Sequence, residues 1–466
     1  MTDDQSRRAF IKRASLLSMA GSASPFVLNL AAMGEAAAAT ASDYKALVCV
    51  FLYGGNDYAN TLVPYDANQY AVYKSLRSSL AYSQAGLGAT VLNPTTPLPS
   101  GAQYALSPGL AKLMPIFDAG KMAVLLNVGT LVQPTTKAQY QARSVRLPPK
   151  LLSHNDQQSF WQSSGAEGAP SGWGGRIGDL FQAGNGTAAL TCVNLAGNAV
   201  FLTGKSAVQY SITPSGPIAL NARTSLQGSA AAANLLQSLV GGTVNGSHMF
   251  SSALGNIGSR ALALHSQVTS ALAAAPQLAT PFPPAADPQS SLGAQLKAVA
   301  SQIAVSQELG VKRQVFFVST GRFDTHDNLG TLHPLLMANL GDALRAFYDA
   351  TVELGVSNQV TTFTASDFGR ALTANNDGSD HGWGSMHFVL GGAVKGRRYY
   401  GVNPVLAHNG PDDIGQGRLI PTTSVDQYAA TLATWFGVSA SDLSLVLPNI
   451  ANFAGSPQGL NLGFLS

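Results

Sequence analysis

Charged residues are scarce in this chain. Only 11% of its 466 residues are Asp, Glu, Lys or Arg, whereas about 25% is usual in globular proteins. The formal net charge is +3, and so small a value does not support nucleic acid as a partner. Gly, Ala, Ser, Thr and Asn are plentiful instead. A surface built mainly from these residues must be largely neutral and polar.

Cysteine is also rare, with two residues in the whole chain. Cys49 lies in ALVCVFLYGG and Cys192 in ALTCVNLAG, and both stretches are apolar and strand-like. No CxxC pair is present, which excludes a zinc knuckle. A disulfide between the two is compatible with an oxidising compartment. We favour the alternative, in which both are buried free thiols that pack as small hydrophobic residues.

The first 39 residues have the organisation of an export signal. Arg7 and Arg8 lie in SRRAFIK, which matches the twin-arginine pattern, and a run of small residues ends near Ala39. Ser, Gly, Asn and Pro interrupt the apolar stretch 14–34, so it falls short of a membrane span. We predict that residues 1–39 are a signal peptide read by the twin-arginine translocase. The mature protein would then be periplasmic or secreted, without an integral membrane segment.

Short apolar runs and helical stretches alternate along the rest of the chain. The runs lie at 46–53, 122–128, 189–195, 314–320 and 359–364. Apolar residues spaced by three and four indicate helices at 252–274, 292–309, 335–354 and 424–437. This alternation predicts an α/β fold, a three-layer α/β/α sandwich whose mainly parallel sheet is covered on both faces. We expect one domain over residues 40–466, with a cap or insertion at about 200–290.

Carboxylates and imidazoles follow several of the predicted strands. Asp57 follows the first run. Asp324 and His326 follow the fourth, in GRFDTHDN, and Asp367 follows the fifth, in SDFGR, with His381 slightly later. Ligands of doubly wound sheets bind beyond the carboxyl ends of the strands, so these side chains are expected at one edge. Carboxylates gathered there would repel one another without a cation, and mixed Asp and His ligands suit zinc, manganese or iron.

Some of these residues also have a purely structural interpretation. Asp57 could cap a turn, and Asp324 could accept backbone N–H groups at the start of a helix. In SHNDQQSFW, Ser153 and His154 could be a nucleophile and its base, or they could cap the helix that begins there, which we slightly favour. The chain has no GxSxG, so a serine-hydrolase elbow is not supported.

Several longer motifs resemble one bacterial family. LVCVFLYGGNDYANTLVPYD, SHNDQQSFW with GWGGRIGD, GRFDTHDN, SDFGRALTANNDGSDHGWGSMHF and SVDQYAATLATWFGV together resemble the exported family called domain of unknown function 1501. That family is remotely similar to the alkaline phosphatase and sulfatase superfamily. The resemblance implies an alkaline-phosphatase-like α/β/α fold with one or two metal ions at the carboxyl edge of the sheet.

The resemblance also implies a set of metal ligands. They are Asp57, Asp324, His326, Asp367 and His381. The chain departs from the superfamily at two places. Asp324 and His326 are two residues apart rather than four, and Phe368 follows the late aspartate where the superfamily has histidine. These departures count against two metals and leave one, or none.

The predicted function is that of an exported metal-dependent hydrolase of phosphate or sulfate esters, acting with zinc or manganese on a small-molecule or polymer ester. Arg370 would bind the oxygens of the transferring group, and His387 or His154 would protonate the leaving oxygen. Ser153 is the first candidate nucleophile and Thr130 the second. The alternative is a non-catalytic binding or assembly protein of the envelope. Phe368, which stands where the superfamily has a histidine, favours this alternative.

Overall fold

The structure is a computed structural model that describes residues 43–466, apart from 198, 219–225, 241–248 and 288. The predicted signal peptide, residues 1–39, lies outside the described residues, so export stays a prediction. Among the residues that are described, no helix has both the length and the apolar composition needed to cross a bilayer.

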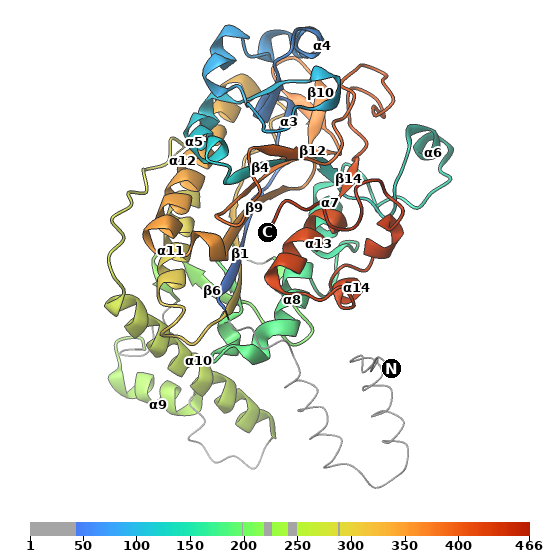
Figure 1. The fold of residues 1–466 in the computed structure, drawn as a ribbon. Coiled ribbons are helices and arrows are strands. Elements are labelled where there is room, and N and C mark those ends of the chain that lie inside the picture. The colour runs from blue at the N-terminus through green and yellow to red at the C-terminus, as the bar shows by residue number, and fades with distance from the viewer. Residues whose placement is uncertain (1–42, 198, 219–225, 241–248, 288) are drawn as a thin grey trace, which may run out of the picture.

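A ten-stranded mixed sheet runs through the molecule (Figure 1). Its strands are β1 Lys45–Leu52, β4 Met122–Gly129, β5 Cys192–Asn194, β6 Tyr210–Thr213, β7 Gly216–Pro217, β8 Arg313–Thr320, β9 Val360–Ser366, β12 Ser385–Leu390, β13 Arg398–Tyr400 and β14 Thr423–Ser424. Their order is β13-β4-β12-β9-β1-β8-β5-β6-β7, and β14 pairs with β4. β1 pairs in parallel with both β8 and β9. The predicted mainly parallel sheet is therefore confirmed.

Helices cover both faces of this sheet, which makes the predicted three layers (Figure 1). One layer contains α11 Leu292–Ala304 and α12 Leu329–Glu353, and the other contains α7 His154–Ser163, α8 Trp173–Phe181, α13 Val425–Phe436 and α14 Leu443–Val446. Smaller elements are α3 Tyr58–Thr61, β2 Leu62–Pro64, α4 Ala67–Arg77, β3 Tyr104–Leu106, α5 Met114–Asp118, α6 Lys137–Ala142, β10 Arg370–Ala374 and β11 Ser379–His381.

The central strand β1 shows why the strands of this sheet are continuous apolar runs in the sequence. Successive side chains of a strand point to opposite faces. Val48 and Val50 accordingly enter the core under α11 and α12, whereas Cys49 and Phe51 enter the core under α8 and α13. All four are at most 1% exposed. A strand buried on both faces needs apolar residues at every position, and the period of two disappears.

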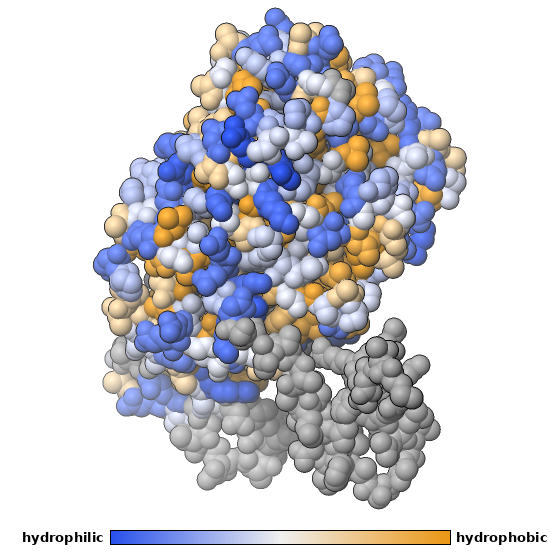
Figure 2. Space-filling view, in the orientation of Figure 1, coloured by the Kyte–Doolittle hydropathy of each residue, from blue (hydrophilic) through white to orange (hydrophobic). Residues whose placement is uncertain are grey.

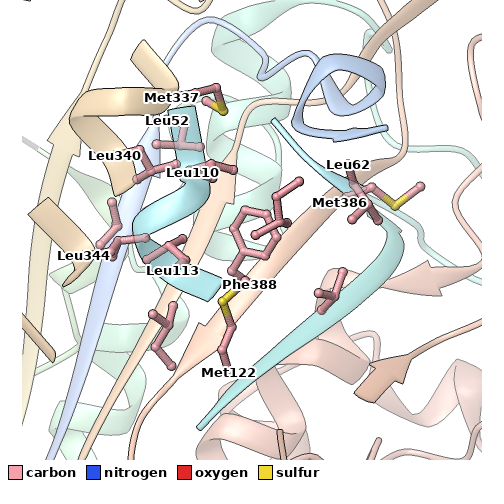
Figure 3. Close-up of a cluster of buried hydrophobic side chains, with 14 of the residues drawn as sticks. Leu52, Leu62, Leu110, Leu113, Met122, Met337, Leu340, Leu344, Met386 and Phe388 are labelled. Carbon is pink, nitrogen blue, oxygen red and sulfur yellow. The ribbon is translucent and has the colours of Figure 1, made fainter. Parts of the chain in front are cut away.

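Close packing of large side chains fills the first of these cores (Figure 3). Met122 of β4 and Phe388 of β12 meet Leu340 and Leu344 of α12, with Leu113 between them. Each is 2% exposed or less. Full burial of such a side chain contributes about 1.5–3 kcal/mol to folding. This burial stabilises the packing of β4 and β12 against α12.

Both cysteines are free and buried in the second core. Burial raises the pKa of the Cys49 thiol well above its usual value and that of Cys192 to about 12. The free-thiol interpretation is confirmed, and the disulfide that the sequence left open does not form in this structure.

Two features of the fold differ from or extend the sequence analysis. β12 was not expected, and it runs antiparallel between β9 and β4. The segment 200–290 contains β6, β7, α9 Ala230–Val240 and α10 Met249–Ala274, and α9 and α10 lie together at one end of the molecule (Figure 1).

The visible surface mixes hydrophilic and hydrophobic residues with many of intermediate hydropathy, as expected from the low charge (Figure 2).

Candidate metal centre

Four segments meet where β1, β8 and β9 end. The loop after β8 carries Asp324 and His326, and β11 ends at His381. His154 is the first residue of α7, and Asp367 directly follows β9. These segments are far apart in the sequence, and the fold brings them to one edge of the sheet.

Three imidazoles and one carboxylate converge there. The Nε2 atom of His381 lies 3.0 Å from Nε2 of His154 and 2.9 Å from Nε2 of His326. Carboxylate oxygens of Asp324 lie 3.2 Å from Nε2 of His381, 3.4 Å from Nε2 of His154 and 3.1 Å from Nε2 of His326. His154, Asp324 and His381 alone already form a group whose ligand atoms all lie within 4.8 Å of one another and could hold a metal ion.

The opposite nitrogens of two of these rings are fixed by oxygen acceptors. Nδ1 of His154 donates to Oδ2 of Asp367 at 2.7 Å, and Nδ1 of His381 donates to the carbonyl of Leu152 at 2.8 Å. A neutral imidazole that donates through Nδ1 presents a lone pair on Nε2. When both rings are neutral, two such lone pairs 3.0 Å apart repel each other, and a cation between them relieves the repulsion. Metal-binding histidines are usually oriented in this way, so the residues present fit a metal ion.

Arg370 holds the carboxylate of Asp324 in place. Its guanidinium donates to Asp324 at 2.9 Å and to the carbonyl of Gly54 at 3.1 Å. Burial alone would raise the pKa of Asp324, but the hydrogen bond and charge of Arg370 outweigh it and lower that pKa. The carboxylate is therefore ionised, as an anionic candidate ligand would be. Gly54 has φ +114°, and a Cβ there would stand 2.4 Å from the backbone nitrogen of Asp324, so glycine is required.

Asp367, predicted to be a ligand, lies behind His154. One of its oxygens accepts from Nδ1 of His154 and from Nε2 of Gln158, each at 2.7 Å, and from the amide of Gly54 at 3.2 Å. The hydrogen bond between Nδ1 of His154 and Asp367 raises the pKa of His154. The side chain of Asp367 is fully buried. Its position is that of the carboxylate in a carboxylate–histidine–metal arrangement rather than of a direct ligand.

The structure does not bring Asp57 to this group. Asp57 is fully buried and forms an ion pair with the equally buried guanidinium of Arg77, at the end of α4. The predicted ligand role therefore competes with a structural one. A buried carboxylate needs a charged partner, and Arg77 already supplies it.

The proposed acid and the proposed anion-binding residue are also placed differently from expectation. His387 lies inside β12, with its ring 5.6 Å from that of Trp161 and 6.1 Å from that of Tyr428. Its burial lowers the pKa to about 3, so it stays neutral. The guanidinium of Arg370 is fully buried and donates hydrogen bonds to a carboxylate oxygen of Asp324 and to the carbonyls of Gly54 and Ser379. Neither side chain is therefore available to an ester, because His387 is buried within β12 and Arg370 is engaged by protein groups.

Comparison with known proteins identifies the family of this chain. A family model described as "Protein of unknown function (DUF1501)" matches residues 44–444. The chain belongs to the DUF1501 family. No curated protein is similar enough to match it. A sulfatase structure from Bacteroides thetaiotaomicron, whose title concerns the metabolism of multiple glycosaminoglycans, aligns with 91% of this chain and 77% of its own, at 10% identity and a TM-score of 0.35.

The wall of the site in this DUF1501 protein is aromatic. The ring of Phe368 lies 4.8 Å from that of His154 and 4.7 Å from that of His381. A Cβ at Gly55, which has φ +82°, would stand 2.4 Å from the Phe368 ring. Phe368 therefore packs tightly behind both imidazoles, at the position where the sequence analysis noted a missing histidine.

His154 is the residue whose role the sequence underestimated in this DUF1501 chain. It was assigned to a helix cap or to acid catalysis, whereas the structure places it among the candidate ligands. Ser153 precedes it and donates its hydroxyl to Asp156 at 2.9 Å. Leu152 adopts φ +72°, a conformation that costs a non-glycine residue about 1–3 kcal/mol and is concentrated at functional sites. In this conformation the Leu152 carbonyl accepts a hydrogen bond from His381. No local sequence pattern predicts the conformation.

Proposed function

We propose that this protein is an exported metal-dependent hydrolase of phosphate or sulfate esters. One observation carries the proposal: the convergence of the Nε2 atoms of His154 and His381 with the carboxylate of Asp324 at the carboxyl edge of the sheet. Zinc and manganese suit such a mixed set of ligands. A divalent ion bound there would polarise an ester oxygen and lower the pKa of a water molecule.

The chain's own residues supply orientation and access. Asp367 fixes the ring of His154, and Arg370 keeps Asp324 ionised and in place. Phe368 excludes water from the inner side. The side chains of Asp324 and His326 are 44% and 45% exposed, so the group is open to substrate on their side. Catalytic metal sites keep such an open position.

Water is the nucleophile that this proposal requires. The hydroxyl of Ser153 is engaged by Asp156, and that of Thr130 is engaged by Gln157. The half-exposed His326, whose Nε2 lies 3.1 Å from Asp324, borders the open side. We assign to it the transfer of a proton to the leaving oxygen, in place of His387.

Metal analysis tests the proposal first. Protein purified from the periplasm should hold about one equivalent of zinc or manganese, and Asp324→Asn should lose most of it. Aryl phosphates, phosphodiesters and aryl sulfates would then be tested as substrates, with Asp324→Asn compared with His387→Gln. Metal below about a tenth of an equivalent after zinc or manganese is added, or equal turnover by Asp324→Asn, would refute the hydrolase. Export is tested by fractionating cells that express Arg7→Lys/Arg8→Lys.

A second candidate function is that of a binding or assembly protein of the cell envelope. Phe368 favours it, because this large ring fills the space behind both imidazoles. Full metal occupancy without turnover of any ester in the panel would support this candidate against the hydrolase.

A further inference from the structure

The segment that leads into His154 is unusually basic. We call residues 137–151, formed by α6 and the loop after it, the basic arm. Lys137, Arg143, Arg146 and Lys150 lie within it, although the whole chain of 466 residues has only 27 Lys and Arg. No Asp or Glu occurs between Asp118 and Asp156 in the sequence. In a chain so poor in charge, this is a local concentration of one sign.

Two of these cations are free. Arg143 and Arg146 are exposed, and within the part of the chain that the structure describes no ion pair or side-chain hydrogen bond engages either of them. Lys150 is 72% exposed and lies 3.6 Å from a carboxylate oxygen of Asp156. Lys137 donates to the carbonyls of Asn409 and Gly410. The two guanidinium groups are therefore available to an anion, and their planar fork matches sulfate and phosphate oxygens.

The arm also forms a pocket of about 460 Å³. Its lining includes Tyr140, Arg143, Leu147 and Leu151. This volume is within the range of small-molecule sites, about 300–1,000 Å³. Tyr140, Leu147 and Leu151 pack against a small buried cluster around Trp383, which anchors the arm to the body of the protein. Arg143 therefore stands on the wall of a supported cavity, while α6 projects from the body (Figure 1).

The arm is covalently continuous with the candidate metal centre. Leu151 precedes Leu152, whose carbonyl accepts from His381, and His154 follows two residues later. His154 lies eight positions after Arg146, and this length of chain spans at most about 29 Å when fully extended. A linear substrate of a few repeating units is long enough to reach both places, whereas a single small ester occupies only one.

We propose that the basic arm binds anionic groups of a linear sulfated or phosphorylated polymer, one of whose esters is hydrolysed at the metal centre. This inference rests on the proposed function and specifies its substrate class. Because the arm's free guanidinium groups lie on the segment that leads into His154, they bind groups of the same polymer some units away from the reacting ester. The affinity should consequently be salt-dependent and increase with the length of the polymer.

The test measures binding to the full mature chain without added metal. Fluorescently labelled heparin octasaccharide and a poly(glycerol phosphate) chain represent the two sources of the anionic groups, and neutral dextran is the blank. Arg143→Gln/Arg146→Gln removes two charges from the arm. Lys74→Gln/Lys297→Gln removes two charges from exposed positions on α4 and α11 and is the matched control. The arm variant should bind about tenfold more weakly at low salt, with a log–log salt slope reduced by about 2, and the control should not.

Three results would overturn the inference. The first is an equal loss in both double variants, which would mean that only the net charge matters. The second is no measurable binding of either polymer. The third is tighter binding of single-stranded DNA or of anionic phospholipid vesicles than of both polymers, with the same loss in the arm variant. Since the readout needs neither metal nor turnover, failure of the hydrolase proposal in the metal analysis is distinguishable from failure of this one.

Discussion

The position of Asp367 behind His154 leads to a quantitative prediction. In Asp367→Asn, the side chain keeps its shape, and its oxygen can still accept from Nδ1 of His154. The negative charge is lost, however, and the new NH2 group must occupy the buried place of Oδ1, which has no hydrogen-bond partner. Loss of such a supporting carboxylate typically weakens metal binding about 10- to 100-fold, which corresponds to about 1.4–2.7 kcal/mol.

The assay is a competition titration of zinc against a chromogenic chelator, carried out on the wild type and on three variants. Asp367→Asn should fall between the wild type and His154→Ala, which removes a candidate ligand outright. His387→Gln should bind as the wild type does, because that ring lies in the core beside Trp161. Circular dichroism before the titration establishes that each variant is folded.

Two outcomes would refute this reasoning. If Asp367→Asn binds zinc as tightly as the wild type, the hydrogen bond to His154 has no role in holding the ion. If it loses as much affinity as His154→Ala, Asp367 is itself a ligand, as the family resemblance implied. The structure argues against both outcomes. One oxygen of Asp367 accepts hydrogen bonds from three donors, and one of these donors is Nδ1 of His154.

Three further predictions concern stability, each measured by urea unfolding. Burial raises the pKa of Asp426 to about 7, so the folded chain keeps a proton that the unfolded chain releases above about pH 4. The free energy of unfolding should therefore fall by about 2–3 kcal/mol from pH 5 to pH 7. Asp426→Asn should abolish this pH dependence. Gly54→Ala should cost about 2 kcal/mol or more, whereas Gly321→Ala, with open space around its Cβ position, should be near neutral. Arg77→Met should cost about 3–5 kcal/mol because it leaves Asp57 buried without a partner, and Arg77→Met/Asp57→Leu should cost less; an equal or larger loss in the double variant would contradict the structural role of the pair.

Much of the fold could be predicted because burial leaves a direct imprint on composition. β1, β4, β8 and β9 were expected to within two residues at each end, since each is a continuous apolar run. The helix at 424–437 was also readable, because Ser424 and Gln427 form a capping box at its start. β12 was missed because His387 and the glycines around it resemble a loop, and only the neighbouring strands show that its alternate residues are core.

The candidate site was predicted less completely than the fold. Carboxylates after parallel strands are expected at one edge by topology alone, and Asp324 and His381 do meet there. Whether a carboxylate faces an ion or a side chain depends on its neighbours in space. Asp57 meets Arg77 and Asp367 meets His154, and neither partner is near in the sequence.

By itself, the sequence determined the class of fold, the positions of β1, β4, β8 and β9 and the edge at which polar groups gather, because hydrophobic burial acts on each segment locally. Only the tertiary structure decided which imidazoles face one another, which acids are neutralised by arginine and that His154 belongs among the candidate ligands. These outcomes depend on distances of about 3 Å between residues that are 20 to 227 positions apart, which no pattern along the chain encodes.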